Sequence, residues 1–260
     1  FSILIWKYSK ILDVADIERK KLERAKEEFV SLASHQLRSP LTAIRGYTSM
    51  LMEDDAKTLT DEQKKFLHII EQSNKKMLDL IESLLNVSRI DLGVFAIEPT
   101  AINIIELADA TLNELLLQIQ EKGLILDKKF GRDIPLINVD PKLVGIIFQN
   151  LLSNAIKYTP AHGQITFEII QKQSDLFITV SDSGMGIPKD QHGKVFSKLF
   201  RAENAVKEVR EGTGLGLYIV KSVVEASGGQ IRFKSEENKG TAFYVTLPLV
   251  GMKRREGRRD

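Results

Sequence analysis

Asn150 and Asn154 lie four residues apart in a segment whose apolar spacing predicts a helix, so their amides share one face. An amide oxygen suits Mg²⁺, which prefers oxygen ligands, keeps several waters and often bridges substrate phosphates. Lys157 and Tyr158 follow at the end of the same predicted helix. Buried asparagines can also cap a neighbouring strand, so this pair alone leaves both interpretations open.

A second cluster begins at Asp182, where a predicted strand with alternating apolar residues ends. The residues that follow are Ser183, Gly184, Met185, Gly186 and Ile187. A carboxylate beside two glycines can accept a hydrogen bond from a ligand in a deep pocket, because glycine lets the backbone come close. A simple hairpin turn is the alternative interpretation.

A third cluster, rich in glycine, stands directly before a predicted helix and comprises Gly212, Thr213, Gly214, Leu215, Gly216 and Leu217. Free N–H groups at a helix N-terminus form a natural cradle for phosphate. The spacing is not that of a P-loop, and no βαβ unit surrounds it, so neither the P-loop nor the Rossmann interpretation fits. The polar segment 188–211 between the two glycine clusters, with Phe196 and Phe200, is predicted to be a mobile lid over a nucleotide.

His35 is a fourth candidate for chemistry, inside an otherwise helical segment over residues 29–51. Pro40 interrupts this helix. A proline there removes one backbone hydrogen bond and presses on the carbonyl four residues back, at a cost of about 3 kcal/mol. That carbonyl belongs to Gln36, so we hypothesise that the helix bends beside His35 when the preceding segment shifts.

Two long amphipathic helices are predicted to carry this histidine. An apolar three-four spacing runs over residues 4–32, as in a parallel coiled coil, and continues into the first helix, which should end near residue 53. Thr60 and Gln63 form a capping-box pattern that opens a second helix, and Gly93 follows its end. Two copies of such a hairpin would close a four-helix bundle.

After Gly93 the pattern changes to short strands mixed with helices, which is typical of a separate α+β domain. Strands are predicted over residues 124–130, 164–171, 175–181, 230–235 and 241–248. Helices are predicted over residues 104–121, 141–157 and 215–226, and Asp140 with Pro141 marks an N-cap. The expected domains are a coiled-coil linker (1–30), a helical hairpin that dimerises (31–93), an α+β domain (94–250) and a basic disordered tail (251–260).

Composition limits the classes of function. The 260 residues are enough for two domains, and a net charge of +2 gives no reason to expect a nucleic-acid partner. The absence of cysteine excludes disulfides and thiol chemistry and weakens any zinc interpretation. The apolar start, residues 1–6, is too short to span a bilayer. It is either a trimmed linker or the cytoplasmic end of a transmembrane helix.

Five motifs resemble those of the catalytic core of a sensor histidine kinase of two-component signalling, which joins a HisKA phosphoacceptor domain to a GHKL-type ATP-binding domain. SHQLRSPL is similar to the H box, NLLSNAIKYT to the N box and DSGMGIP to the first glycine box. VFSKLF is similar to the F box and GTGLGL to the second glycine box. Each motif alone is weak, whereas five in order over residues 30–249 are specific.

The resemblance implies a dimeric four-helix bundle followed by a Bergerat-type α+β sandwich that binds ATP with Mg²⁺. It implies that His35 accepts the γ-phosphate and passes it to an aspartate of a response regulator. It also implies that Asn154 holds Mg²⁺, with Asn150 nearby, and that Asp182 binds the adenine amino group. The other nucleotide-binding residues that it implies are Lys157, Tyr158, Gly184, Gly186, Ile187, Phe196, Phe200, Gly212, Thr213, Gly214, Leu215, Gly216, Leu217 and Thr241.

Two residues of the H box depart from the commonest family pattern. Gln36 stands where the family usually has Glu or Asp; its oxygen can accept an imidazole N–H and fix the tautomer, but it cannot take the proton. We hypothesise that Gln36 orients His35 without deprotonating it. Ser39 stands where threonine is commoner and keeps the hydroxyl that helps to place water for dephosphorylating the partner. Arg38 could steady phosphate or form a surface ion pair.

Two other functions stay open as alternatives. A nucleotide-driven machine related to gyrase, mismatch-repair or chaperone ATPases would share the asparagine and glycine boxes but not the H box. A degenerate ATP-binding scaffold, or a member that acts chiefly as a phosphatase, is kept open by Gln36.

The implied partners are a second copy of the chain and a response regulator. The regulator is expected to dock near His35 on exposed side chains such as Arg45, Tyr47 and Thr48. The chain would then be the cytoplasmic portion of a bacterial sensor, which segments preceding Phe1 could anchor to the inner membrane.

Overall fold

The chain divides into two compact units, Phe1–Gly93 and Val94–Asp260. The computed structural model describes residues 36–52, 59–91, 97–209 and 212–254. The expected coiled coil and His35 lie outside these residues. Within the described ranges, no helix has both the length and the apolar character needed to cross a bilayer.

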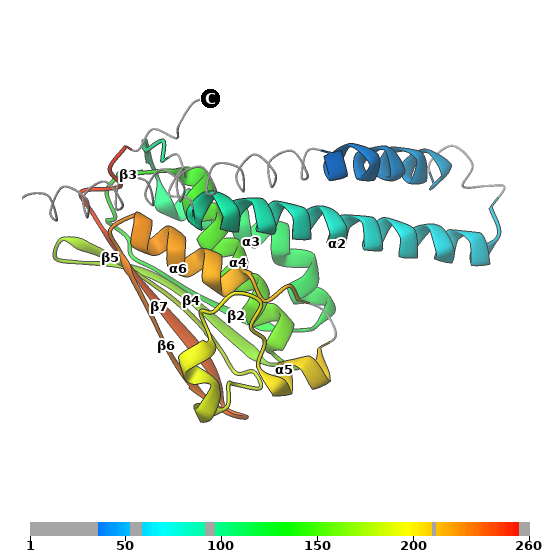
Figure 1. Ribbon diagram of the computed structural model, residues 1–260. Coiled ribbons are helices and arrows are strands. Elements are labelled where there is room, and N and C mark those ends of the chain that lie inside the picture. Colours follow the sequence, from blue (N-terminus) through cyan, green and yellow to red (C-terminus); the bar gives the residue numbers. More distant parts are fainter. Residues whose placement is uncertain (1–35, 53–58, 92–96, 210–211, 255–260) are drawn as a thin grey trace, which may run out of the picture. The chain divides into compact units, whose positions relative to one another are not determined.

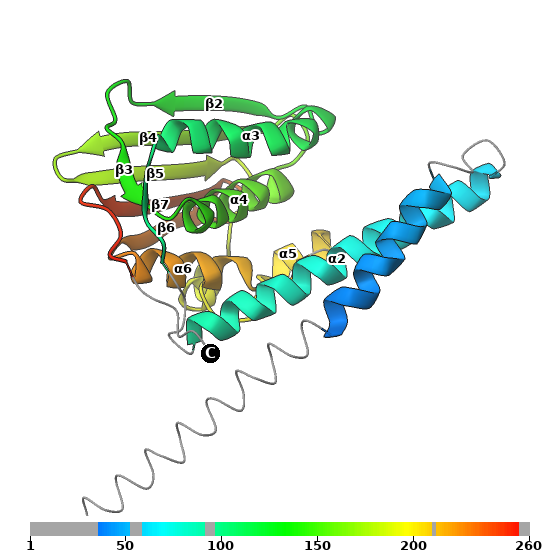
Figure 2. The same ribbon diagram turned by 90° about the horizontal axis from the view of Figure 1, so that it is seen from above.

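The first unit is a helical hairpin. A helix over residues 36–52, blue in Figure 1, lies beside α2 (Asp61–Asp91), and Figure 2 shows the same neighbours from a second direction. The predicted capping box is confirmed at the start of α2. The Thr60 N–H donates to Gln63 Oε1 at 2.8 Å, and the Gln63 N–H donates to Thr60 Oγ1 at 3.2 Å.

An apolar cluster and one polar contact join the two helices. Leu41, from the first helix, packs with Ile81 and Leu85 of α2. Asn74, which is only 1% exposed, donates from Nδ2 to the Leu41 carbonyl at 2.7 Å. Its Oδ1 has no hydrogen-bond partner in the part of the chain that the structure describes. The polar contact thus lies one residue beyond Pro40.

Many large apolar side chains of the hairpin remain exposed. They are Leu37, Ile44, Tyr47, Met50 and Leu51 on the first helix and Phe66, Ile69, Ile70, Met77, Leu80 and Leu84 on α2. The prediction that Thr48 is exposed is wrong. Thr48 lies two turns after Leu41 on the same face, is 5% exposed, and donates its hydroxyl to the Ile44 carbonyl.

The second unit is an α+β sandwich, which confirms the predicted fold class. Its sheet has the order β2 (Ile125–Phe130), β4 (Gln164–Lys172), β5 (Asp175–Asp182), β7 (Gly240–Pro248) and β6 (Gln230–Glu236). The β2–β4 pair is parallel and the other pairs are antiparallel. Figures 1 and 2 show helices α3 (Ile104–Glu121), α4 (Pro141–Tyr158) and α6 (Gly216–Ala226) on one face of this sheet.

The core lies between the sheet and these helices. Buried residues alternate along the central strands, and Ile178 of β5 stands opposite Ile169 of β4 and Val245 of β7. Phe148 of α4 meets Phe167 of β4 edge to face, with ring centroids 5.3 Å apart. This packing fixes α4 across the sheet, and α4 carries the candidate residues Asn150, Asn154, Lys157 and Tyr158.

Four short elements were not predicted. They are β1 (Thr100–Ile102), its antiparallel partner β3 (Ile137–Val139), the 3₁₀ helix η1 (Lys189–Lys194) and α5 (Glu203–Glu208). Elements this short show too little periodicity to be recognised in a sequence.

The packed part of the second unit extends beyond the boundary expected at residue 250. Met252 is 4% exposed, and its N–H donates to the Asn138 carbonyl at 2.8 Å. Its sulfur accepts the Asp140 N–H at 3.3 Å. The basic residues over 255–260 lie outside the described residues.

Candidate nucleotide-binding site

Helix α4 carries the two asparagines and is fixed at its start by Asp140. One carboxylate oxygen, Oδ1, accepts the N–H groups of Lys142 at 3.0 Å and Leu143 at 3.3 Å. The other oxygen accepts the Glu98 N–H at 2.9 Å. Pro141 occupies the first turn, as predicted. These bonds set the start of α4 and hence the place of every side chain that it carries.

The two asparagines of α4 have different surroundings. Asn150 donates from Nδ2 to the Ile146 carbonyl at 2.8 Å. Its Oδ1 lies so close to Gly216, the first residue of α6, that a Cβ there would collide with it. Asn154 is half-buried, and its amide has no partner among the described residues. The oxygen of Asn154 is therefore the freer of the two to bind a ligand.

Asp182, at the end of β5, is held by one of its oxygens. Oδ1 accepts the N–H of Gly184 at 2.8 Å and that of Thr241 at 3.3 Å. Burial raises the pKa of this carboxyl to about 6, although both backbone N–H groups act in the opposite direction. At pH 7 the group is mainly ionised, so it can accept a hydrogen bond from a ligand through Oδ2.

The first glycine loop, residues 183–187, is hydrogen-bonded both to the end of α4 and to β6. The Met185 N–H donates to the Tyr158 carbonyl at 3.2 Å, and the Ile187 N–H donates to Ser235 Oγ at 2.8 Å. Gly186 has φ of 66°, and a Cβ there would collide with the Glu236 carbonyl. The loop leads from β5 to η1, so it is not a simple hairpin turn.

The second glycine loop, residues 212–217, packs against two other parts of the site. A Cβ on Gly212 would lie 2.7 Å from Lys157 Nζ, at the end of α4. Gly214 has φ of 69°, and a Cβ there would lie 2.6 Å from the carbonyl carbon of Leu199. Since α6 begins at Gly216, the loop brings the α6 N-terminus to the face of α4 that carries Asn150.

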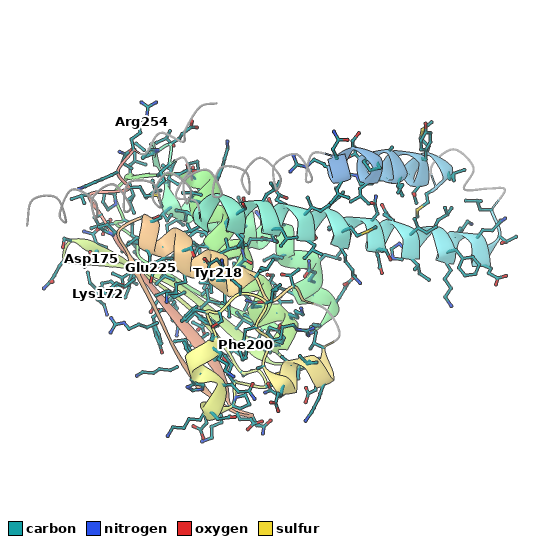
Figure 3. All side chains as sticks on the ribbon, in the orientation of Figure 1. Lys172, Asp175, Phe200, Tyr218, Glu225 and Arg254 are labelled. Atoms are coloured by element: carbon teal, nitrogen blue, oxygen red, sulfur yellow. The ribbon has the colours of Figure 1, made fainter. Side chains whose placement is uncertain are left out.

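Phe196 of the predicted lid packs against the sheet. Its ring meets that of Phe233 on β6 at 5.7 Å and an interplanar angle of 78°, and Lys221 Nζ lies 5.8 Å from its centroid. These contacts give Phe196 a packing role that needs no nucleotide. Figure 3 labels Phe200, from the segment before α5, and Tyr218, from α6.

Arg201 is a residue of the site that the sequence did not predict. Its guanidinium donates to the carbonyls of Ala205, at 3.2 Å, and of Val209. Burial raises the pKa of Tyr158, while the charge and hydrogen bond of Arg201 lower it in part. Asn204 of α5 donates to the Gly186 carbonyl at 3.0 Å. The lid segment therefore contacts both α4 and the first glycine loop, which no local pattern in a polar segment could indicate.

The H-box candidates belong to the hairpin unit. Gln36, Arg38 and Ser39 are exposed in the described part of the first helix, and Thr42 Oγ1 donates to the Arg38 carbonyl at 2.9 Å. The other candidates belong to the second unit. In the described ranges no group of three histidine or acidic side chains could hold a metal ion. Among the candidate residues, the amide oxygen of Asn154 is a donor of the type that Mg²⁺ prefers.

Two protein families match the chain. Residues 25–93 match the His Kinase A (phospho-acceptor) domain. Residues 139–251 match the histidine kinase-, DNA gyrase B-, and HSP90-like ATPase family. The two matches have the order that the H, N and glycine boxes predict.

The chain is similar to several sensor kinases. It is 34% identical over 226 residues to the circadian input-output histidine kinase CikA of Synechococcus elongatus, covering 86% of this chain and 30% of CikA. It is 33% identical over 233 residues to the sensor histidine kinase WalK of Bacillus subtilis, covering 89% of this chain and 38% of WalK. The chain thus spans about a third of the length of these relatives.

Solved structures agree on the fold. Full-length ShkA in complex with AMPPNP matches with a TM-score of 0.72 at 23% identity, over 88% of this chain and 47% of ShkA. The mycobacterial sensor histidine kinase MprB matches with a TM-score of 0.50 at 28% identity, over 60% of this chain and 99% of the MprB chain.

Proposed function

The chain belongs to the sensor histidine kinases, with a HisKA domain before an ATP-binding domain, and we propose that it is an ATP-dependent protein-histidine autokinase. His35 accepts the γ-phosphoryl group and passes it to an aspartate of a response regulator. The observation that carries the proposal is the convergence of Asp182, the end of α4 and both glycine loops within one ATP-binding unit.

The second unit supplies the groups that would bind and orient ATP. Asp182 accepts the adenine amino group through Oδ2. The second glycine loop directs backbone N–H groups at the phosphates, where Lys157 adds positive charge. Asn154, with Asn150 beside the α6 N-terminus, would hold Mg²⁺, which neutralises phosphate charge when bound. The free amide of Asn154 and the all-oxygen donor set fit this ion.

The hairpin unit supplies the nucleophile. Imidazole is largely neutral at pH 7, so His35 needs a free nitrogen in the correct tautomer more than it needs a base. We propose that the Gln36 oxygen fixes this tautomer and that Arg38 steadies phosphate. Ser39 helps to place the water that hydrolyses the aspartyl phosphate of the response regulator, which releases inorganic phosphate. Transfer then depends on positioning the γ-phosphate against the imidazole.

We also propose how the chain assembles and where in the cell it acts. The exposed apolar face of the hairpin pairs with a second copy of the chain to form a four-helix bundle. The predicted coiled-coil linker over residues 1–30, which lies outside the described residues, would join a sensor segment to residues 31–93. Since ATP and receiver domains are cytoplasmic, the chain is the cytoplasmic part of a longer sensor.

Incubation with γ-labelled ATP and Mg²⁺ tests the proposal. The chain should acquire acid-labile, base-stable label, and His35→Ala should lose it. In the same assay Gln36→Leu should slow labelling and Gln36→Glu should not. If both Gln36 variants were labelled at the wild-type rate, residue 36 would have no catalytic role. Release of free phosphate without labelled protein would instead indicate an ATPase, and ATP binding without either product would indicate a scaffold or phosphatase.

A further inference from the structure

Lys122, at the end of α3, makes an unusual set of contacts with the end of α4. Its ammonium nitrogen lies 2.8 Å from the Ile156 carbonyl, 3.0 Å from that of Lys157 and 2.9 Å from that of Thr159. The last carbonyls of a helix have no intrahelical partner. An ammonium has three N–H donors, and here all three meet a carbonyl.

The Tyr158 carbonyl, in the middle of this stretch, is bonded by the first glycine loop instead of by Lys122. Tyr158 O accepts the Met185 N–H of the first glycine loop at 3.2 Å. The four consecutive carbonyls from Ile156 to Thr159 are therefore satisfied by Lys122 and by the loop that follows Asp182. This shared anchorage links the end of the N-box helix to the loop that carries the adenine acceptor.

The backbone of Lys122 strengthens the same junction. Its carbonyl accepts the His162 N–H at 3.0 Å, and the Ile125 N–H donates to the Gly163 carbonyl at 2.9 Å. The lysine charge also lies at the negative end of the α4 dipole, where a cation is favourable. Burial lowers the pKa of Lys122, yet its three carbonyl partners all require the protonated form.

We propose that Lys122 is a positioning residue for nucleotide binding: it anchors the last turn of α4 and thereby places Lys157, Tyr158 and the Asp182 loop around ATP. The inference rests on the proposed nucleotide site. Lys122 itself is directed at backbone carbonyls and not at the ligand. It acts before phosphoryl transfer, so it affects ATP affinity and not the rate of the chemical step.

The test compares Lys122→Gln, Lys122→Arg and the control Lys128→Gln in the full chain. Lys128 lies on neighbouring β2 and forms an exposed ion pair with Asp109 at 2.9 Å, so its replacement removes the same charge without touching α4. Calorimetry with ATP and Mg²⁺ should show a Kd raised about tenfold in Lys122→Gln, which corresponds to about 1.4 kcal/mol. Lys122→Arg should raise Kd only about threefold, because guanidinium keeps charge and donors in another geometry. Lys128→Gln should bind as wild type does.

Hydrogen exchange separates positioning from general destabilisation. The Met185 amide should exchange faster in both Lys122 variants, while the amide of Ile178, in the centre of the sheet, should keep its protection. The kcat for autophosphorylation at saturating ATP should stay within about twofold of wild type, since only ground-state binding is changed.

The outcomes distinguish the two proposals. Wild-type Kd and wild-type Met185 exchange in Lys122→Gln would overturn the inference alone, whereas a wild-type chain that binds no ATP would overturn the proposed function and this inference with it. Where Lys122→Gln does not fold, Lys122→Arg decides, and unchanged Kd and Met185 exchange in that variant would overturn the proposal.

Discussion

Asp182 carries a partly buried carboxyl group whose ionisation costs stability. Burial raises the pKa of its carboxyl from 3.8 to about 6, against the pull of two backbone N–H groups. Because the folded-state pKa is above the unfolded one, this residue adds stability below pH 3.8, and that contribution is lost as the pH rises to about 6. At neutral pH the domain therefore carries a partly buried, ionised carboxylate that two backbone N–H groups stabilise only in part.

Asp182→Asn should remove this pH dependence. Relative to wild type, the free energy of unfolding of the variant should rise by roughly 1.4 kcal/mol per pH unit between about pH 4 and 6 and level off above, in urea titrations without nucleotide. Asp175→Asn, at the other end of β5, is the matched control. Parallel stability curves for wild type and Asp182→Asn would contradict the shifted pKa.

At the scale of elements, a buried amide joins the two helices of the hairpin. Asn74 bonds the Leu41 carbonyl just beyond Pro40, where proline has removed one bond of the helix ladder. This contact gives the weakened stretch a fixed point on α2. If the helix bends at Pro40, as hypothesised, the bond from Asn74 would hold the residue after Pro40 in place. The sequence did not predict this bond.

Asn74→Ala should destabilise the hairpin by about 1–3 kcal/mol, because it deletes a buried hydrogen bond and leaves a small cavity. Asn74→Leu should cost less, since leucine fills the space that alanine leaves empty. Ser73→Ala, an exposed neighbour, should stay within about 0.5 kcal/mol of wild type. Urea unfolding followed by circular dichroism measures all three. Equal stabilities for the alanine and leucine variants would show that the cavity left by alanine is not costly.

At the scale of the whole molecule, the two units differ in how they bury apolar surface. The second unit encloses its own core, whereas the hairpin leaves a stripe of large side chains exposed. Ile70, Met77 and Leu84 recur every seven residues along α2 and are each 44–45% exposed. Such a stripe predicts that the hairpin is completed by a second hairpin.

Light scattering should therefore find a dimer, and Met77→Lys should shift it to monomer at micromolar concentration. A charge in the centre of the seam would be buried without a partner in the dimer. Gln72→Lys, an exposed polar position on the same helix, should leave the dimer intact. A monomeric wild type would contradict the predicted dimer. A dimeric Met77→Lys would show that the dimer forms through a different surface.

Sequence alone determined the features that depend on neighbours within one helical turn or along one strand. These include the capping box at Thr60, the N-cap at Asp140, the alternating strands, the order of the motifs and the α+β class, because their signals are local. Tertiary structure decided whatever joins distant residues. Lys122 meets carbonyls 34–37 residues away, Asn74 bonds a carbonyl 33 residues away, and Phe196 packs on Phe233. The parallel β2–β4 pairing was decided in the same way. No local pattern encodes such contacts, because they form only when a shared core brings separate elements together.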